Sequence, residues 1–146
     1  MNMHSLSPWL RVTDQLVPKD IPVLKKAGIL SVVCNRPDGE QPDQPDHFAL
    51  QAACSEAGLS FTYLPVAPGG ITDIHVQQFG VLLERLPAPI AAYCRTGTRS
   101  TSLWALSQIR SGGATPEQVI SIAGGAGYDL SGLDSRLRDA PSSTAQ

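Results

Sequence analysis

The sequence predicts an α/β fold in three layers, in which a mainly parallel central sheet is flanked by helices. Short apolar runs rich in β-branched residues alternate with segments of helical spacing, and Gly, Pro or acidic residues separate them. The chain of 146 residues, with 42% hydrophobic and 16% charged residues, is also long enough for one packed core. We expect a single domain over 1–146, with its core at about 9–133 and a loose tail at 134–146.

The first elements are justified by apolar runs and by their end signals. A strand is predicted near Trp9–Val12. A short helix follows over 20–28, because Asp20 can cap its N-terminus and Gly28 can end it. The run ILSVVCN at 29–35 then predicts a buried strand, since it is apolar and rich in β-branched residues.

A loop and a second helix–strand pair come next. The stretch RPDGEQPDQPD (36–46) contains three prolines and four carboxylates, so it continues neither a helix nor a strand. Apolar residues recur at helical spacing over 47–58, and Gly58 ends that helix. LSFTYLPV then predicts a strand over 59–66, which the turn sequence APGG ends.

The second half of the chain follows the same rule. Thr72 opens a helix over 72–86, and PIAAYC (89–94) predicts a strand that leads directly into a loop at 94–100. Helices are predicted over 100–113, before a Gly-Gly stop, and over 115–125, where Thr-Pro-Glu-Gln makes a capping box with Pro at the first helical position.

Composition and charge exclude several classes of function. The net charge of −2 favours neither a nucleic-acid partner nor a membrane surface, and no apolar run is long enough to span a bilayer. The N-terminal residues lack the basic and apolar blocks of a signal peptide, so we expect a cytoplasmic protein. The three cysteines have no C-x-x-C spacing, which argues against a disulfide framework or a zinc site. We expect no cofactor and no metal.

The loop YCRTGTRS carries the strongest chemical signal. Cys94 follows a predicted strand and comes just before the start of a predicted helix. At that position the backbone N–H groups and the helix dipole favour negative charge. Cys94 should therefore exist largely as the thiolate, which is the reactive nucleophile. Gly97 permits turns that a side chain would obstruct, and Arg99 offers a planar fork for two oxygens of an anion. The remaining candidate residues of this anion-binding loop are Arg95, Thr96, Thr98 and Ser100.

Several stretches together resemble a known family. AGILSVVCNRPDGE, GLSFTYLPV, YCRTGTRS and GAGYDLSGL are similar, in this order, to the phosphatase-like domain of beta-lactamase hydrolase-like proteins. That family is similar to the protein tyrosine and dual-specificity phosphatases. The resemblance implies a cysteine-dependent phosphatase fold, with Cys94 as nucleophile and Arg99 as anion clamp. Here Tyr93 stands where those phosphatases have His, and four residues instead of five separate Cys94 from Arg99.

The proton donor for a leaving group is the open question of the phosphatase interpretation. The resemblance implies an Asp soon after the strand over 59–66, but the sequence there is APGG. Asp38, Glu40 or Asp73 would have to replace it, and Asp38 is our first candidate. Arg36, at the end of a neighbouring strand, is a candidate support for the loop.

The length of the loop suggests a second chemistry. YCRTGTRS also resembles the active-site loop of rhodanese-type sulfurtransferases, which implies a persulfide on Cys94 and a leaving group that needs no proton. Three hypotheses therefore remain. The first is a hydrolase that cleaves a phosphoester through phosphocysteine. The second is a sulfurtransferase acting on thiosulfate or a persulfide, and the third is a non-catalytic module that binds an anion or a partner.

Overall fold

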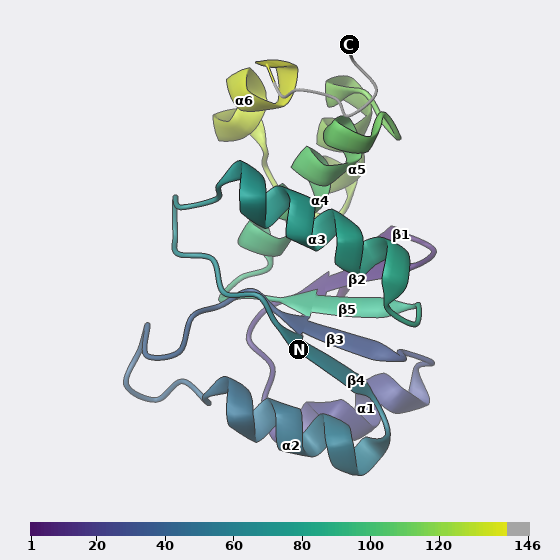
Figure 1. Cartoon of the computed structure of the whole chain (residues 1–146), viewed down its shortest axis with the longest axis vertical. Helices are drawn as coiled ribbons and strands as arrows, with labels where there is room; N and C mark the ends of the chain where they lie inside the picture. Colours follow the sequence, from purple (N-terminus) through teal and green to yellow (C-terminus); the bar gives the residue numbers. More distant parts are fainter. Residues whose placement is uncertain (140–146) are drawn as a thin grey trace.

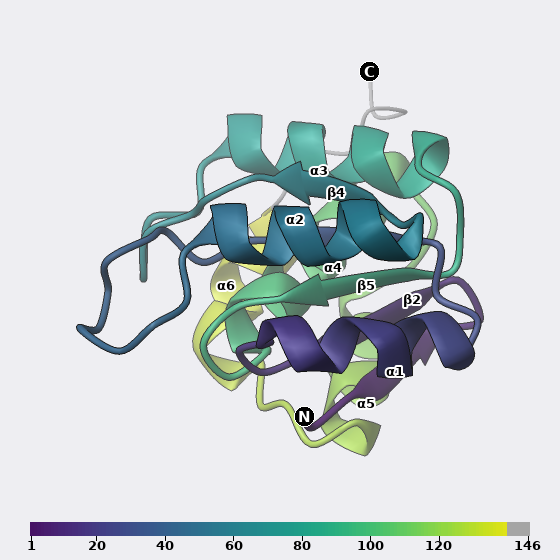
Figure 2. The ribbon, with the colours of Figure 1, turned by 90° about the horizontal axis from the view of Figure 1, so that it is seen from below.

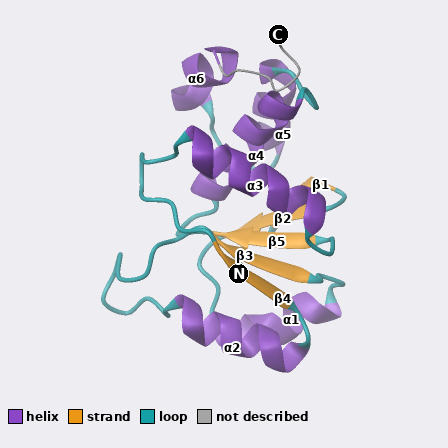
Figure 3. Cartoon of the chain, viewed as in Figure 1, coloured by secondary structure: helices purple, strands orange, loops and turns teal. Residues whose placement is uncertain are grey.

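The computed structural model of the chain describes residues 1–139, which form five strands, six α-helices and two 3₁₀ helices (Figure 3). In chain order they are β1 (His4–Ser7), β2 (Leu10–Thr13), η1 (Pro18–Asp20), α1 (Ile21–Lys26), β3 (Ser31–Cys34), α2 (His47–Ala57), β4 (Ser60–Tyr63), α3 (Asp73–Arg85), β5 (Ile90–Tyr93), α4 (Thr98–Ser111), α5 (Pro116–Gly125), η2 (Ser131–Leu133) and α6 (Asp134–Asp139).

The sheet has the strand order β1-β2-β5-β3-β4, and only the β1–β2 pair is antiparallel. The predicted mainly parallel α/β fold is therefore confirmed. Because β2, β5, β3 and β4 run parallel, their carboxyl ends meet at one edge of the sheet. The segment that begins at Cys94 leaves β5 at this edge, and the Asn35–Arg36 segment leaves β3 beside it.

Helices cover both faces of the sheet, as the three-layer prediction required. Helices α1 and α2 lie on one face, and α3 to α6 lie on the other (Figures 1 and 2). Each face has its own apolar core, because the buried strand residues alternate between the two sides. Among the largest fully buried side chains are Phe79 and Leu103 of the α3–α4 side and Leu24 and Leu50 of the α1–α2 side.

Most of the predicted capping signals act as expected, and Asp20 is an exception. The Thr72 hydroxyl accepts the His75 N–H at the start of α3, and Thr115 and Gln118 form a reciprocal capping box at the start of α5. Gly58 ends α2 in the left-handed region. At Asp20 the carboxylate accepts the Val17 N–H and so serves η1 instead of α1.

Two further features differ from the prediction. The hairpin strand β1 was not expected, because residues 4–7 carry a polar and exposed face that gives no clear strand pattern. Residues 134–139, predicted to be part of a loose tail, form α6, since Leu137 is fully buried against the α4–α5 side. The rest of that tail lies outside the described residues. That the whole chain is one domain stays a prediction. No helix within residues 1–139 is both long and apolar enough to cross a membrane.

Candidate active site

Strand β5 delivers Cys94 to the carboxyl edge of the sheet, directly before α4. The Gly97 N–H donates a hydrogen bond to Cys94 Sγ at 3.1 Å, and the thiol is buried at the bottom of the loop. Gly97 is the N-cap of α4, so the sulfur lies against the unpaired amides and the positive end of a 14-residue helix. The start of α4 therefore offers unpaired amides to an anion that binds beside Cys94.

Gly97 is required here for two separate reasons. Its φ of +97° lies in the region that favours glycine. In addition, a Cβ at this position would lie 2.3 Å from Tyr128 Oη and 2.9 Å from Tyr128 Cζ. The tyrosine ring therefore packs directly behind the loop, with its hydroxyl 3.5 Å from the Thr96 carbonyl. Burial, with a smaller contribution from nearby Cys94, raises the pKa of Tyr128.

Arg99 lines the same cleft as Cys94, and one edge of its guanidinium is already occupied. Nη1 and Nη2 donate to the two Glu40 carboxylate oxygens at 2.9 and 3.2 Å, and Nη1 also donates to the Val66 carbonyl at 2.8 Å. These bonds use both protons of Nη1 and one proton of Nη2. The Nε–H and the second Nη2–H form the other edge. They have no hydrogen-bond partner among residues 1–139, so they can donate to two oxygens of an anion.

Arg36 holds Glu40 from the opposite side. Its side chain is 2% exposed, and Nε donates to Glu40 Oε1 at 2.9 Å. Its remaining nitrogens donate to Gln15 Oε1 at 2.9 Å and to Gln41 Oε1 at 3.1 Å. Glu40 thus bridges two arginines that come from distant parts of the chain. Arg36, the predicted support for the loop, therefore contacts Arg99 only through Glu40 in this arrangement, and its role stays a prediction.

The charge state of Glu40 follows from these contacts. Burial alone would raise the pKa of its carboxyl, but the hydrogen bonds and charges of Arg99 and Arg36 outweigh burial. The net effect is a pKa below the ordinary value. Glu40 is therefore an ionised brace for Arg99, and in this state it has no proton to donate.

The other predicted acids lie away from the sulfur. Asp38 is bound to His47, whose backbone N–H and Nδ1 contact its two carboxylate oxygens at 2.8 and 2.6 Å. The His47 ring in turn stacks on Tyr63. Asp73 is 77% exposed and lies 3.6 Å from Arg136. Neither carboxylate lines the cleft at Cys94, which removes the geometric basis for our first-choice acid, Asp38.

Of the remaining loop residues, Ser100 is buried and makes a structural contact, whereas Arg95, Thr96 and Thr98 are exposed to solvent. Ser100 is fully buried and its hydroxyl donates to Asn35 Oδ1 at 2.8 Å, so it ties α4 to the residue that directly follows β3. The Thr96 hydroxyl donates to Thr98 Oγ1 at 3.1 Å. Arg95 is exposed at the rim, while its backbone carbonyl accepts the Gln15 N–H at 3.2 Å.

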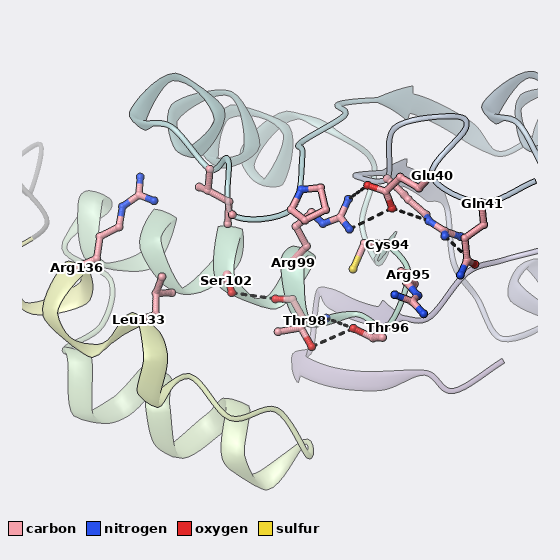
Figure 4. Close-up of a pocket in the computed structure, with 14 residues that line it drawn as sticks. Glu40, Gln41, Cys94, Arg95, Thr96, Thr98, Arg99, Ser102, Leu133 and Arg136 are labelled. Carbon is pink, nitrogen blue, oxygen red and sulfur yellow. Dashed lines mark hydrogen bonds and ion pairs between the residues drawn. The ribbon is translucent and has the colours of Figure 1, made fainter. Parts of the chain in front are cut away.

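A cleft of about 680 Å³ opens above the sulfur (Figure 4). It is lined by Arg36, Glu40, Gln41, Pro68, Gly69, Ile71, Cys94, Arg95, Thr96, Thr98, Arg99, Ser102, Leu133 and Arg136. Among these residues Glu40 is the only carboxylate. Within residues 1–139 no three His, Cys, Asp or Glu side chains gather as metal ligands would. The cleft therefore combines a thiol, an amide nest and several arginines, which suits an anionic ligand.

Sequence reasoning missed part of this site. Tyr128 lies within the GAGYDLSGL stretch but received no role, because its place behind Gly97 depends on the packing of a segment about thirty residues away. Gln15 and Gln41 were missed because an amide carries no recognisable pattern. Leu133 and Arg136 were assigned to the end of the core and to the tail, and nothing in their local sequence connects them to Cys94.

The comparisons with known proteins agree with this geometry. The family model of the phosphatase-like domain of beta-lactamase hydrolase-like proteins matches residues 2–111. Beta-lactamase hydrolase-like proteins from Xylella fastidiosa and Agrobacterium fabrum are 34% and 29% identical over 130 residues, or 89% of this chain. The chain spans only 30% of the length of these relatives.

Solved structures show the same fold. A Neisseria meningitidis protein described as a candidate phosphatase is 33% identical, has a TM-score of 0.87, and is matched over 99% of its chain and 96% of this one. TpbA from P. aeruginosa, solved in complex with pTyr, has a TM-score of 0.71 over 96% of this chain and 84% of its own, but only 17% identity. It therefore shows the fold alone. The matched family and the Neisseria relative support a phosphatase function.

Proposed function

The chain belongs to the family of phosphatase-like domains of beta-lactamase hydrolase-like proteins, and on that premise we propose that it is a hydrolase whose nucleophile is the Cys94 thiolate. The observation that carries the proposal is the position of Cys94 Sγ, which accepts the Gly97 N–H at the start of α4 and lies in the cleft that Arg99 also lines. A phosphoester bound there would place its phosphorus next to the sulfur.

The proposed reaction has two steps. The Cys94 thiolate attacks phosphorus, an S–P bond forms, and the P–O bond to the leaving group breaks. Water then attacks the phosphocysteine, releases inorganic phosphate and restores the thiolate. Arg99, fixed by Glu40 and the Val66 carbonyl, together with the amides at the start of α4, would stabilise the charge on the phosphoryl oxygens.

A second candidate function is sulfur transfer, and one observation favours it. Among the residues that line the cleft, the only carboxylate is the doubly paired Glu40, so an alkoxide would have to leave without a proton donor. With thiosulfate, Cys94 would attack the outer sulfur, an S–S bond would form, and sulfite would leave unprotonated. An acceptor thiolate would then take the sulfur from the Cys94 persulfide.

Parallel assays separate these functions. The chain is incubated with 4-nitrophenyl phosphate and, separately, with thiosulfate, while phenolate and sulfite release and the intact mass are measured. Cys94→Ser is the test variant, and Cys54→Ala is the matched control, because Cys54 is a buried thiol in the core on the α1–α2 side.

Each outcome has a definite meaning. Phenolate release that is lost in Cys94→Ser and kept in Cys54→Ala supports the phosphatase proposal. A Cys94-dependent gain of one sulfur atom with no phenolate release overturns it in favour of sulfur transfer. If the wild type and Cys94→Ser are equally inert while the cleft still binds sulfate, the chain is a non-catalytic anion-binding module.

A further inference from the structure

The cleft at Cys94 extends well beyond the space that one phosphate needs. Its lining runs from the loop of β5 to Leu133 of η2 and Arg136 of α6, and it also includes Ile71 before α3. Figure 4 shows Leu133 and Arg136 at one end and Cys94 with Arg95 toward the other. These far residues lie beyond 111, where the matched family segment ends, so the far end is built by a different part of the chain from the nucleophile.

The charged residues that line the cleft are mostly positive. Four arginines line it, and a single carboxylate opposes them, although the chain as a whole has a net charge of −2. Glu40 is fully engaged with Arg36 and Arg99 at the near end. Arg136 therefore adds a positive charge at the far end that no carboxylate in the cleft lining offsets.

The ion pair that Arg136 makes with Asp73 is weak. Asp73 Oδ1 lies 3.6 Å from Arg136 Nη2, and the Asp73 side chain is 77% exposed. A solvated pair at this distance contributes little and can be replaced by a better-placed anion. Arg138, two residues further along α6, behaves differently, because it is bound to both Asp134 and Glu117 and does not line the cleft.

From these observations we propose that Arg136 forms a second anion subsite, so that the preferred substrate carries two anionic groups. One group sits at Cys94 and Arg99, the other sits at Arg136, and the apolar side chains of Ile71 and Leu133 pack against the part of the substrate between them. The packing of α6 sets the position of Arg136, since the adjacent Leu137 is fully buried. This inference rests on the proposed anion site at Cys94 and specifies its substrate class.

The test compares singly and doubly anionic probes. Binding of phenyl phosphate and of a series of 4-(carboxyalkyl)phenyl phosphates of increasing chain length is measured by calorimetry in the Cys94→Ser chain, which cannot turn them over. We expect one chain length to bind about three- to fivefold more tightly than phenyl phosphate, as a partly exposed ion pair would give. Higher salt should reduce this ratio.

Matched variants identify the residue responsible. Arg136→Gln should bring the ratio of the two affinities close to one, whereas Arg138→Gln, with the same change in charge on the same helix, should leave the ratio as it was. Asp73→Asn should raise the ratio, because the competing carboxylate is gone.

The outcomes separate this inference from the proposed function. If no carboxylated probe binds more tightly, or if Arg136→Gln keeps the full preference, the second subsite is refuted even when the wild type hydrolyses phenyl phosphate. An Arg136-dependent preference in a chain with no phosphatase activity supports the subsite and refutes the proposed reaction. Failure of both probes to bind refutes both.

Discussion

Replacement of Gly97 by Ala should damage both the fold and the site, and its cost can be worked from the structure. The backbone at this position has a φ of +97°, where an L residue is strained. The new Cβ would also lie 2.3 Å from Tyr128 Oη, well inside any normal contact, and 2.9 Å from Tyr128 Cζ. Tyr128 is 8% exposed and part of the core, so its ring has little room to move.

The two contributions add to a large effect. The left-handed conformation costs about 1–2 kcal/mol in a non-glycine residue, and overpacking of a filled site costs about 1–3 kcal/mol more. The expected loss in free energy of unfolding for Gly97→Ala is therefore about 2–5 kcal/mol. Urea denaturation followed by circular dichroism measures it as a shift of the midpoint at constant slope.

Gly28 provides the matched control. Its φ of +91° is similar, but a Cβ there would have no atom within 4 Å, so Gly28→Ala should cost only about 1–2 kcal/mol. Tyr128→Phe removes the hydroxyl that the new Cβ would meet, so the double variant with Gly97→Ala should recover part of the lost free energy of unfolding. Equal destabilisation by the two glycine substitutions, with no recovery in the double variant, would refute the steric reasoning.

Three further predictions follow from the cleft and the cysteines. Glu40→Gln should lower both the free energy of unfolding and the activity at pH 7, because Arg99 loses the carboxylate that holds it. The folded-state pKa of Glu40 is lowered, so the ionised carboxylate stabilises the fold fully above its unfolded pKa, and this stabilisation is lost as pH falls through the folded value. The difference in free energy of unfolding between wild type and variant, measured by urea titration, should therefore close at acidic pH. Burial raises the thiol pKa of Cys34 and Cys54 to about 11, so mass spectrometry should find neither alkylated by iodoacetamide in the folded chain at pH 8, and modification of either would contradict this. Hydrolysis of phenyl phosphate should be about a hundredfold slower than that of 4-nitrophenyl phosphate, because a positioned acid contributes about 10²–10⁴ in rate and Glu40, the only carboxylate among the described residues that line the cleft, is ionised. Similar rates would show that a proton donor exists.

The fold was largely predictable because its signals are local. Apolar runs identified β3, β4 and β5, and the threonine caps located the starts of α3 and α5 correctly. The strand β1 and helix α6 were missed because neither has such a signal. Helix α6 is a six-residue segment whose stability depends on burying Leu137 against α4 and α5, which only the assembled molecule provides.

Only those residues of the site that lie close together in the sequence could be predicted. Cys94, Gly97 and Arg99 are close in sequence, and the strand–loop–helix order already implies their relation to the helix N-terminus. Asp38 was favoured because its loop leaves the correct edge of the sheet, and that placement is right. Its carboxylate nevertheless points to His47, a local preference that no sequence pattern announces.

Glu40 explains why the bracing of Arg99 and proton donation exclude one another in this cleft. Its two oxygens accept hydrogen bonds from Arg99 and Arg36, and that role requires the ionised form. A general acid must instead hold a proton at working pH, and a proton on Glu40 would weaken the support of the clamp just as charge develops on the substrate. Since no other carboxylate in the described residues lines the cleft, the proposed reaction at Cys94 is best matched to leaving groups that depart as stable anions. Acidic phenols and sulfite both meet that condition, which is why the two proposed chemistries share one requirement on the substrate.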